Sequence, residues 1–100
     1  MQPLDTPFDK TLYARRAAVL KALGHPARLF MVEALARQER CVNELTQLVG
    51  LDVSTVSKHL LVLKNAGIVS DNKRGKQVFY TLRVPCVVNF FTCVESVLGQ

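Results

Sequence analysis

Apolar residues recur at intervals of three and four along most of this 100-residue chain, the spacing typical of amphipathic helices. Gly24, Gly50 and Gly67 each follow such a stretch, and glycine often ends a helix. Pro26 suits the first turn of a new helix, where its missing N–H costs nothing. The pattern predicts helices at residues 8–23, 26–38, 41–49, 53–66 and 85–98, preceded by a loose arm at 1–7. The second helix is expected to turn Leu29, Val32, Leu35 and Ala36 inward.

The spacing changes after Gly67 from helical to alternating. Val78 and Tyr80 alternate with Phe79 and Thr81, as expected for a half-buried strand. The sequence therefore predicts two strands, at 68–72 and 76–82, around a polar turn Lys73-Arg74-Gly75. The predicted elements follow the order of a winged helix-turn-helix, a mainly α fold with a small β component: two helices, two closely linked helices, a hairpin and a last helix. We expect residues 8–100 to form this single domain.

The fourth predicted helix has a distinctive outward face. Asp52 precedes it and can accept a hydrogen bond from the free amides of its first turn. An inner stripe is expected at Val53, Val56, Leu60 and Leu63. The outward positions are Ser54, Thr55, Ser57, Lys58 and Leu61. Small, hydroxylated and basic side chains can approach base edges and phosphates closely, and the amides of the helix N-terminus add partial positive charge.

The net charge of the chain is concentrated in this region. The whole chain carries +5, with 13 basic and 8 acidic residues, but residues 53–77 alone hold five basic residues and one acid. Hydrophobic residues make up 49% of the chain, which excludes a disordered protein. A concentrated positive charge of this kind favours an anionic partner, and double-stranded DNA fits the predicted fold.

The sequence therefore predicts a DNA-binding surface with two roles. Sequence specificity is expected from Ser54, Thr55, Ser57 and Lys58. Position on the DNA and salt-dependent affinity are expected from Lys64, Lys73, Arg74, Lys76 and Gln77.

The last predicted helix is apolar on almost every side. Only Asn89, Thr92, Glu95 and Ser96 interrupt it strongly. A helix of this kind needs cover on more than one side, and in so small a domain we expect the second side to contact another copy of the chain. Because one recognition helix reads only a few base pairs, a homodimer through the first and last helices would read a palindromic operator. Association with a membrane is the alternative.

Three segments resemble the ArsR/SmtB family of bacterial metal-sensing and thiol-sensing repressors. They are ALGHPARL at 22–29, VNELTQLVGLDVSTVSKHLLVLKNAGIV at 42–69 and KRGKQVFYTL at 73–82. The resemblance implies a homodimeric winged-helix repressor, paired through its first and last helices, that releases its operator when an inducer binds. The pattern S-x-H-L-x-x-L begins at Ser57 and includes His59, whose position in the family implies a structural role or a phosphate contact.

The cysteines are the candidate inducer site. The family's third-helix thiol site has two cysteines separated by one residue, and this chain keeps Cys41 but has Asn43 at the second position. The family's fifth-helix zinc site needs histidines that this helix lacks. Cys86 and Cys93 remain, seven residues apart on one helical face and about 10 Å apart along the axis, too far to hold one ion alone.

Two kinds of thiol chemistry stay open for these residues. Thiolates of Cys41, Cys86 and Cys93 would suit arsenite, antimonite or another soft metal ion, which favours sulfur ligands. A disulfide or persulfide switch is the alternative. Cys93 can equally be a small buried apolar residue. No cofactor is required for DNA binding itself.

Other classes of protein find less support in the sequence. No phosphate-binding glycine loop, paired catalytic carboxylates or nucleophile elbow is evident, so an enzyme is not expected. The N-terminus lacks the features of a signal peptide, and three cysteines are an odd number, so we expect a reducing cytoplasmic location. A winged-helix module that binds another protein instead of DNA is the remaining alternative.

Overall fold

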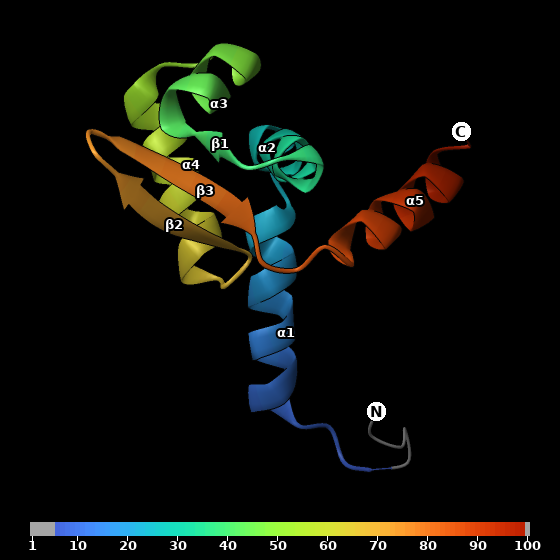
Figure 1. Ribbon diagram of the computed structural model, residues 1–100. Coiled ribbons are helices and arrows are strands. Elements are labelled where there is room, and N and C mark those ends of the chain that lie inside the picture. Colours follow the sequence, from blue (N-terminus) through green and yellow to red (C-terminus); the bar gives the residue numbers. More distant parts are fainter. Residues whose placement is uncertain (1–5, 100) are drawn as a thin grey trace.

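The computed structural model describes residues 6–99 and contains five helices and a small sheet within them (Figure 1). The elements in chain order are α1 (Lys10–Leu23), α2 (Pro26–Arg37), β1 (Arg40–Cys41), α3 (Val42–Val49), α4 (Val53–Asn65), β2 (Val69–Arg74), β3 (Gln77–Leu82) and α5 (Val87–Leu98). All five helices and both long strands occur where the sequence predicts them, so the winged helix-turn-helix prediction is confirmed. Most of the predicted arm at 1–7 lies outside the described residues.

The sheet has three strands in the order β1-β3-β2, and both pairings are antiparallel. Arg74 pairs with Gln77, so the hairpin turns at Gly75 and Lys76. Strand β2 therefore ends two residues later than predicted, and β3 begins one residue later. Gly75 has a φ of +61°, a left-handed conformation that glycine adopts without strain. The two-residue strand β1 is the one element that the sequence pattern did not predict, because two residues show no alternation.

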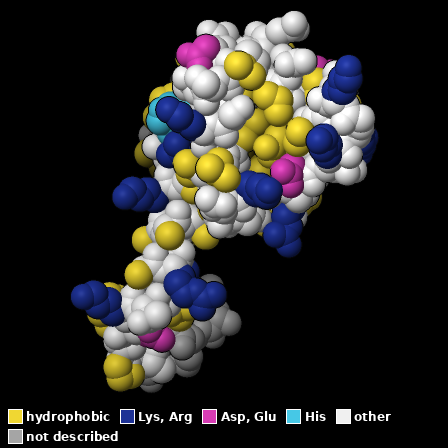
Figure 2. Space-filling model, turned by 90° about the vertical axis from the view of Figure 1, so that its left-hand side faces the viewer, with side chains coloured by type: hydrophobic (Ala, Val, Ile, Leu, Met, Phe, Trp, Pro, Cys, Tyr) yellow, Lys and Arg dark blue, Asp and Glu magenta, His cyan; other side chains and the backbone are white. Residues whose placement is uncertain are grey.

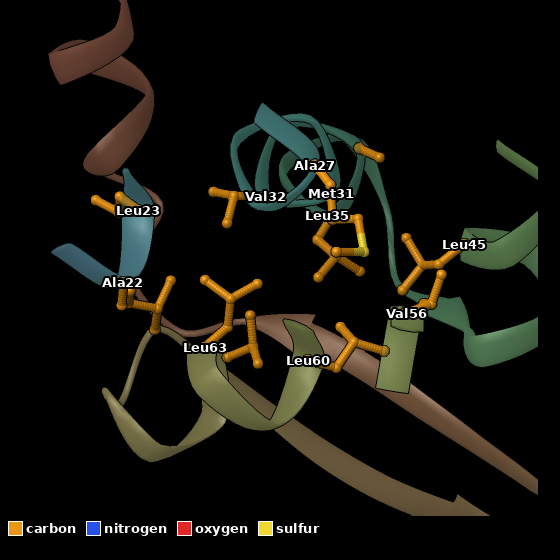
Figure 3. Close-up of a cluster of buried hydrophobic side chains, with 13 residues drawn as sticks. Ala22, Leu23, Ala27, Met31, Val32, Leu35, Leu45, Val56, Leu60 and Leu63 are labelled. Atoms are coloured by element: carbon orange, nitrogen blue, oxygen red, sulfur yellow. The ribbon is translucent and has the colours of Figure 1, made fainter. Parts of the chain in front are cut away.

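The core lies where α2, α3, α4 and the start of β2 meet (Figure 3). Met31, Val32, Leu45 and Leu60 are completely buried there. The inward face of α2 differs from the predicted one, because Ala27 and Met31 are buried while Leu29 and Ala36 are exposed. The helix is rotated so that Leu29 faces away from the core and toward α5.

Helix α5 extends away from the rest of the domain (Figure 1). None of its residues is buried, and its contact with the core is made by the partly buried Val87 and Phe91. Within residues 6–99 no helix combines the length and the apolar character needed to cross a membrane.

Candidate nucleic-acid interface

The turn between α3 and α4 places a carboxylate at the start of α4. Gly50 ends α3 with a φ of +75°, and Asp52 caps α4 by accepting a hydrogen bond from the Thr55 amide at 2.8 Å. The hydroxyl of Ser54 donates to Asp52 Oδ1 at 2.7 Å, and that of Thr55 donates to Oδ2 at 3.0 Å. These bonds, that from Ser54 foremost, lower the pKa of Asp52 from 3.8 to about 2.

The cap changes what the first turn of α4 offers to DNA. The ionised carboxylate of Asp52 offsets the partial positive charge predicted at this helix end. The hydroxyl hydrogens of Ser54 and Thr55 point to Asp52, so these two side chains present lone pairs, not donors, to an approaching base.

The outward face of α4 consists of Ser54, Ser57, Lys58 and Leu61, all of them exposed. Their spacing of three, four and seven residues places them in one row along the helix. Thr55 is half-buried beside this row. The opposite face, at Val56, Leu60 and Leu63, is buried in the core, which fixes the rotation of the helix and therefore which side chains face outward.

Val53 was predicted to be buried with that inner stripe, but 53% of it is exposed. It occupies the first position of the helix, where the turn before α4 leaves it without a packing partner in the core cluster.

His59 faces inward, toward the start of α2, and is half-buried. Its Nδ1 lies 3.2 Å from Nη1 of Arg28, and its ring centroid lies 4.4 Å from that of His25. Burial lowers the pKa of His59 below 6.5, and the nearby charge of Arg28 and proximity to His25 add to the effect. The geometry favours the structural role among the two that the family resemblance implied.

Arg28 joins three helices and was not singled out from the sequence, although it lies in the ALGHPARL segment. Its Nε donates to the carbonyl of Ala22, and its Nη2 lies 3.4 Å from the carbonyl of Lys21, so it caps the end of α1. The contact with His59 extends the same side chain to α4. His25 in turn caps α2 by accepting the Ala27 amide at its Nδ1, 3.1 Å away.

Two basic residues of the predicted surface form ion pairs within the chain. Lys64 of α4 binds Asp71 of β2, with Nζ and Oδ2 3.0 Å apart. Arg74 at the end of β2 binds Glu39 through two parallel hydrogen bonds of 2.7 Å each, which raises the pKa of the guanidinium. No local sequence signal points to Glu39, which lies 35 residues away in the loop between α2 and β1.

The other residues predicted to hold the DNA backbone are exposed. Lys73, Lys76 and Gln77 lie at the tip of the β2–β3 hairpin, which we call the wing. Figure 2 shows the side of the molecule on which the wing tip lies, with Lys and Arg side chains spread over it among a few carboxylates. The wing and the outward row of α4 are thus both available to a large anionic partner.

The structure does not gather the three cysteines within one chain. All three are free thiols. Cys41 is buried at the junction of β1 and α3, whereas Cys86, just before α5, and Cys93, within α5, are exposed. Among residues 6–99, no group of three or more Cys, His, Asp or Glu side chains is arranged to hold a metal ion. A small cavity of about 130 Å³ separates Cys41 from Lys76 and Gln77 of the wing.

An apolar groove of about 420 Å³ lies between α1, α2 and α5. Its lining includes Leu20, Phe30, Phe90, Val94 and Leu98, all largely exposed. Val97, on the same helix, is 85% exposed. So much exposed apolar surface on one helix indicates a surface that another molecule covers.

Comparison with known proteins agrees with the fold. Residues 25–71 match the family described as bacterial regulatory protein, arsR family. The chain is 34% identical over 93 residues to Rv0081, an HTH-type transcriptional regulator of Mycobacterium tuberculosis, covering 92% of this chain and 82% of that protein. The crystal structure of Rv0081 matches with a TM-score of 0.79 over 91% of this chain and 92% of the other.

Two further relatives are informative. The biofilm growth-associated repressor of Xylella fastidiosa is 44% identical over 66 residues, which are 66% of this chain and 58% of the repressor. The solution structure of the homodimeric winged helix-turn-helix DNA-binding domain of Mb0332 from Mycobacterium bovis is 28% identical, with a TM-score of 0.78 over 96% of this chain and 91% of that domain. With the matched helix-turn-helix and wing, these similarities show that the chain belongs to the arsR family of bacterial regulatory proteins and is a DNA-binding transcriptional repressor, not an enzyme.

Proposed function

We propose that this repressor reads its operator with the outward row of α4 and holds the DNA backbone with the wing. The single observation that carries the proposal is the row itself, in which Ser54, Ser57, Lys58 and Leu61 are exposed opposite a fully buried face. Lys58 can donate to guanine acceptors, and Leu61 can contact a thymine methyl group in the major groove. Lys73 and Lys76 supply phosphate contacts.

The repressor acts as a homodimer through α1 and α5. The support is the groove between α1, α2 and α5 together with the exposed Val97 and Leu98, and the homodimeric state of the M. bovis relative. Two copies related by a twofold axis would place two α4 helices on a palindromic operator.

The test is a gel shift with DNA from upstream of the protein's own gene, at two salt concentrations. Lys58→Ala is expected to weaken specific binding more than non-specific binding, whereas Lys73→Ala should weaken both equally. Equal losses from the two substitutions would contradict the assignment of α4 as the reading helix. Lack of any salt-sensitive complex would favour a protein-binding module.

The inducer acts on cysteine thiols. Cys86 and Cys93 are exposed near the surface where we place the partner copy, and seven residues of helix separate them by about 10 Å along the axis. One chain's pair therefore cannot hold a single soft ion, but thiolates from two copies of α5 can approach each other. Arsenite, antimonite or a soft divalent metal ion would bind such thiolates, with Cys41 as the third candidate ligand.

A disulfide or persulfide switch is the second candidate. It needs only two thiols that come together, and Cys86 and Cys93 are both exposed to an oxidant or sulfur donor. Residues on one straight helix at this spacing exceed the Cα separation of a disulfide, so the bond would link two copies.

Single Cys→Ser variants at the three positions separate these inducers. Arsenite titrated against the operator complex should release the native protein from the DNA but not a variant that lacks one of the ligands. If the switch is a disulfide, mass spectrometry after mild oxidation should detect a cross-linked dimer. Unchanged release by both treatments in all three variants would remove the cysteines from the mechanism.

A further inference from the structure

Of the two ion pairs described above that join the wing to the body of the domain, the pair at its tip has the better geometry. The guanidinium of Arg74 makes two parallel hydrogen bonds of 2.7 Å to the two oxygens of Glu39. The same guanidinium lies 4.7 Å from the centre of the Phe79 ring. Two-pronged binding of a carboxylate requires the planar guanidinium, and lysine cannot reproduce it.

The contacts link the wing tip to the edge of the sheet where β1 begins. Arg74 is the last residue of β2, and Phe79 of β3 pairs with Cys41 of β1 on one side and with Asn72 of β2 on the other. Glu39 immediately precedes β1. The pair therefore ties the free end of a two-stranded hairpin, which would otherwise move about its base, to a part of the chain held by α2 and α3.

Strand geometry places the neighbouring lysine differently. Consecutive side chains of a strand point to opposite faces, so Lys73 lies on the face opposite to Arg74. Lys73 shares its face with Asp71, whose carboxylate binds Lys64 of α4. The two adjacent basic residues of the wing thus have different surroundings: Lys73 is on the face toward α4, and Arg74 is engaged with Glu39.

We propose that Glu39 and Arg74 are positioning residues for DNA binding, which set the angle of the wing, and that Arg74 does not itself contact a phosphate. Isolated surface ion pairs contribute little, but a doubly hydrogen-bonded pair of arginine and carboxylate is the exception. The phosphate contacts of the wing then come from Lys73 and Lys76. The proposal rests on the DNA interface proposed above.

Operator binding by the full-length protein, measured by fluorescence anisotropy at several salt concentrations, tests the pair. The native protein and Lys73→Ala come first, because they test the interface itself: Lys73→Ala should reduce the slope of log affinity against log salt by about one per subunit. If the native protein shows no salt-dependent specific complex, the proposed interface fails, independently of Arg74.

Arg74→Ala and Glu39→Ala are each expected to weaken binding about three- to tenfold with the salt slope unchanged. The double variant should be no weaker than either single variant. Arg74→Lys should be as weak as Arg74→Ala, because lysine cannot form the two-pronged pair. The exchanged pair, Glu39→Arg with Arg74→Glu, should recover part of the lost affinity, because it restores the ion pair but not the contact with Phe79. Circular dichroism and thermal unfolding of each variant control for folding.

A direct phosphate contact by Arg74 predicts the reverse. Glu39→Ala would then tighten binding, Arg74→Lys would remain near native, Arg74→Ala would reduce the salt slope, and the exchanged pair would stay weak because it presents a carboxylate to the phosphate. Any of these four results, or an unchanged affinity in all variants, overturns the proposal.

Discussion

Replacing Leu60 and Leu61 separately by alanine tests the rotation of α4 on which the proposed DNA surface depends. The two residues are adjacent on one helix and chemically identical, but Leu60 is 0% exposed and Leu61 is 55% exposed. Leu60 packs in the cluster that also contains Leu45 of α3 and Val32 of α2 (Figure 3). Alanine and leucine are both good helix formers, so the difference between the variants reports burial.

The size of the effect follows from that burial. Leu60→Ala removes three carbon groups from the core, about 2 to 3 kcal/mol of transfer free energy, and the cavity left behind brings the loss to about 2–5 kcal/mol. Leu61→Ala should change the free energy of unfolding by no more than about 0.5 kcal/mol. Each kcal/mol corresponds to about 4–8 °C in Tm for a domain of this size.

The assay is urea unfolding followed by circular dichroism, with all proteins at one concentration because a dimer's stability depends on concentration. Operator binding is measured in parallel, and Leu61→Ala should weaken it while leaving stability near native. A similar loss of stability in both variants, or a larger loss in Leu61→Ala, would refute the rotation of α4 and with it the reading row.

Three further predictions concern a histidine, a cap and the dimer. The pKa of His59 in the folded protein lies below 6.5, so the unfolded chain takes up a proton first as the pH falls. The contribution of neutral His59 to stability should therefore be complete above about pH 6.5 and be lost at lower pH. His59→Gln should make the urea midpoint of unfolding depend less on pH between about pH 7 and 5. Asp52→Ala should shorten α4, measured by amide exchange, and weaken operator binding, measured by gel shift, whereas Asp52→Asn should keep most of the helix and most of the binding; equal effects of the two substitutions would contradict the cap. Since the pKa of Asp52 is about 2 in the folded protein against an ordinary 3.8, the contribution of the charged cap to stability is present above about pH 4 and lost toward pH 2. Val97→Asp should yield monomers in sedimentation velocity, because it places a charge on the proposed dimer surface of α5. Leu48→Asp, at an exposed site on α3, is the control and should leave the dimer intact. Dimers in both variants would place the interface elsewhere than α5.

The periodicity of the sequence was sufficient for the helices and the wing because apolar residues recur at the spacing of each element and glycine or proline marks its boundaries. It was not sufficient for the rotation of α2. Leu29 is apolar and correctly spaced for burial, yet it is exposed beside α5 and lines the groove. A single sequence cannot distinguish a residue buried in its own core from one buried by a partner, since both are apolar.

The basic residues of the site show a similar division. Their clustering in residues 53–77 is visible as composition, but the partner of Arg74 is not, because Glu39 lies 35 residues away and carries no local signal. Likewise, the hydroxyls of Ser54 and Thr55 are suitable for DNA by type, and only the structure shows that their hydrogens are bound to Asp52. Residue type indicates what a side chain can do, and its neighbours determine what it is free to do.

The position of Arg28 has a mechanical consequence. One guanidinium contacts carbonyls near the end of α1 and the ring of His59 in α4, so the helix we assign to the dimer interface and the helix we assign to DNA share a joint. A turn of α1 relative to its partner would be transmitted to α4 without passing through the sheet. The distance between the two reading helices of a dimer is then set partly by this joint, and a signal that shifts the pairing of α1 and α5 can change that distance while each domain keeps its fold.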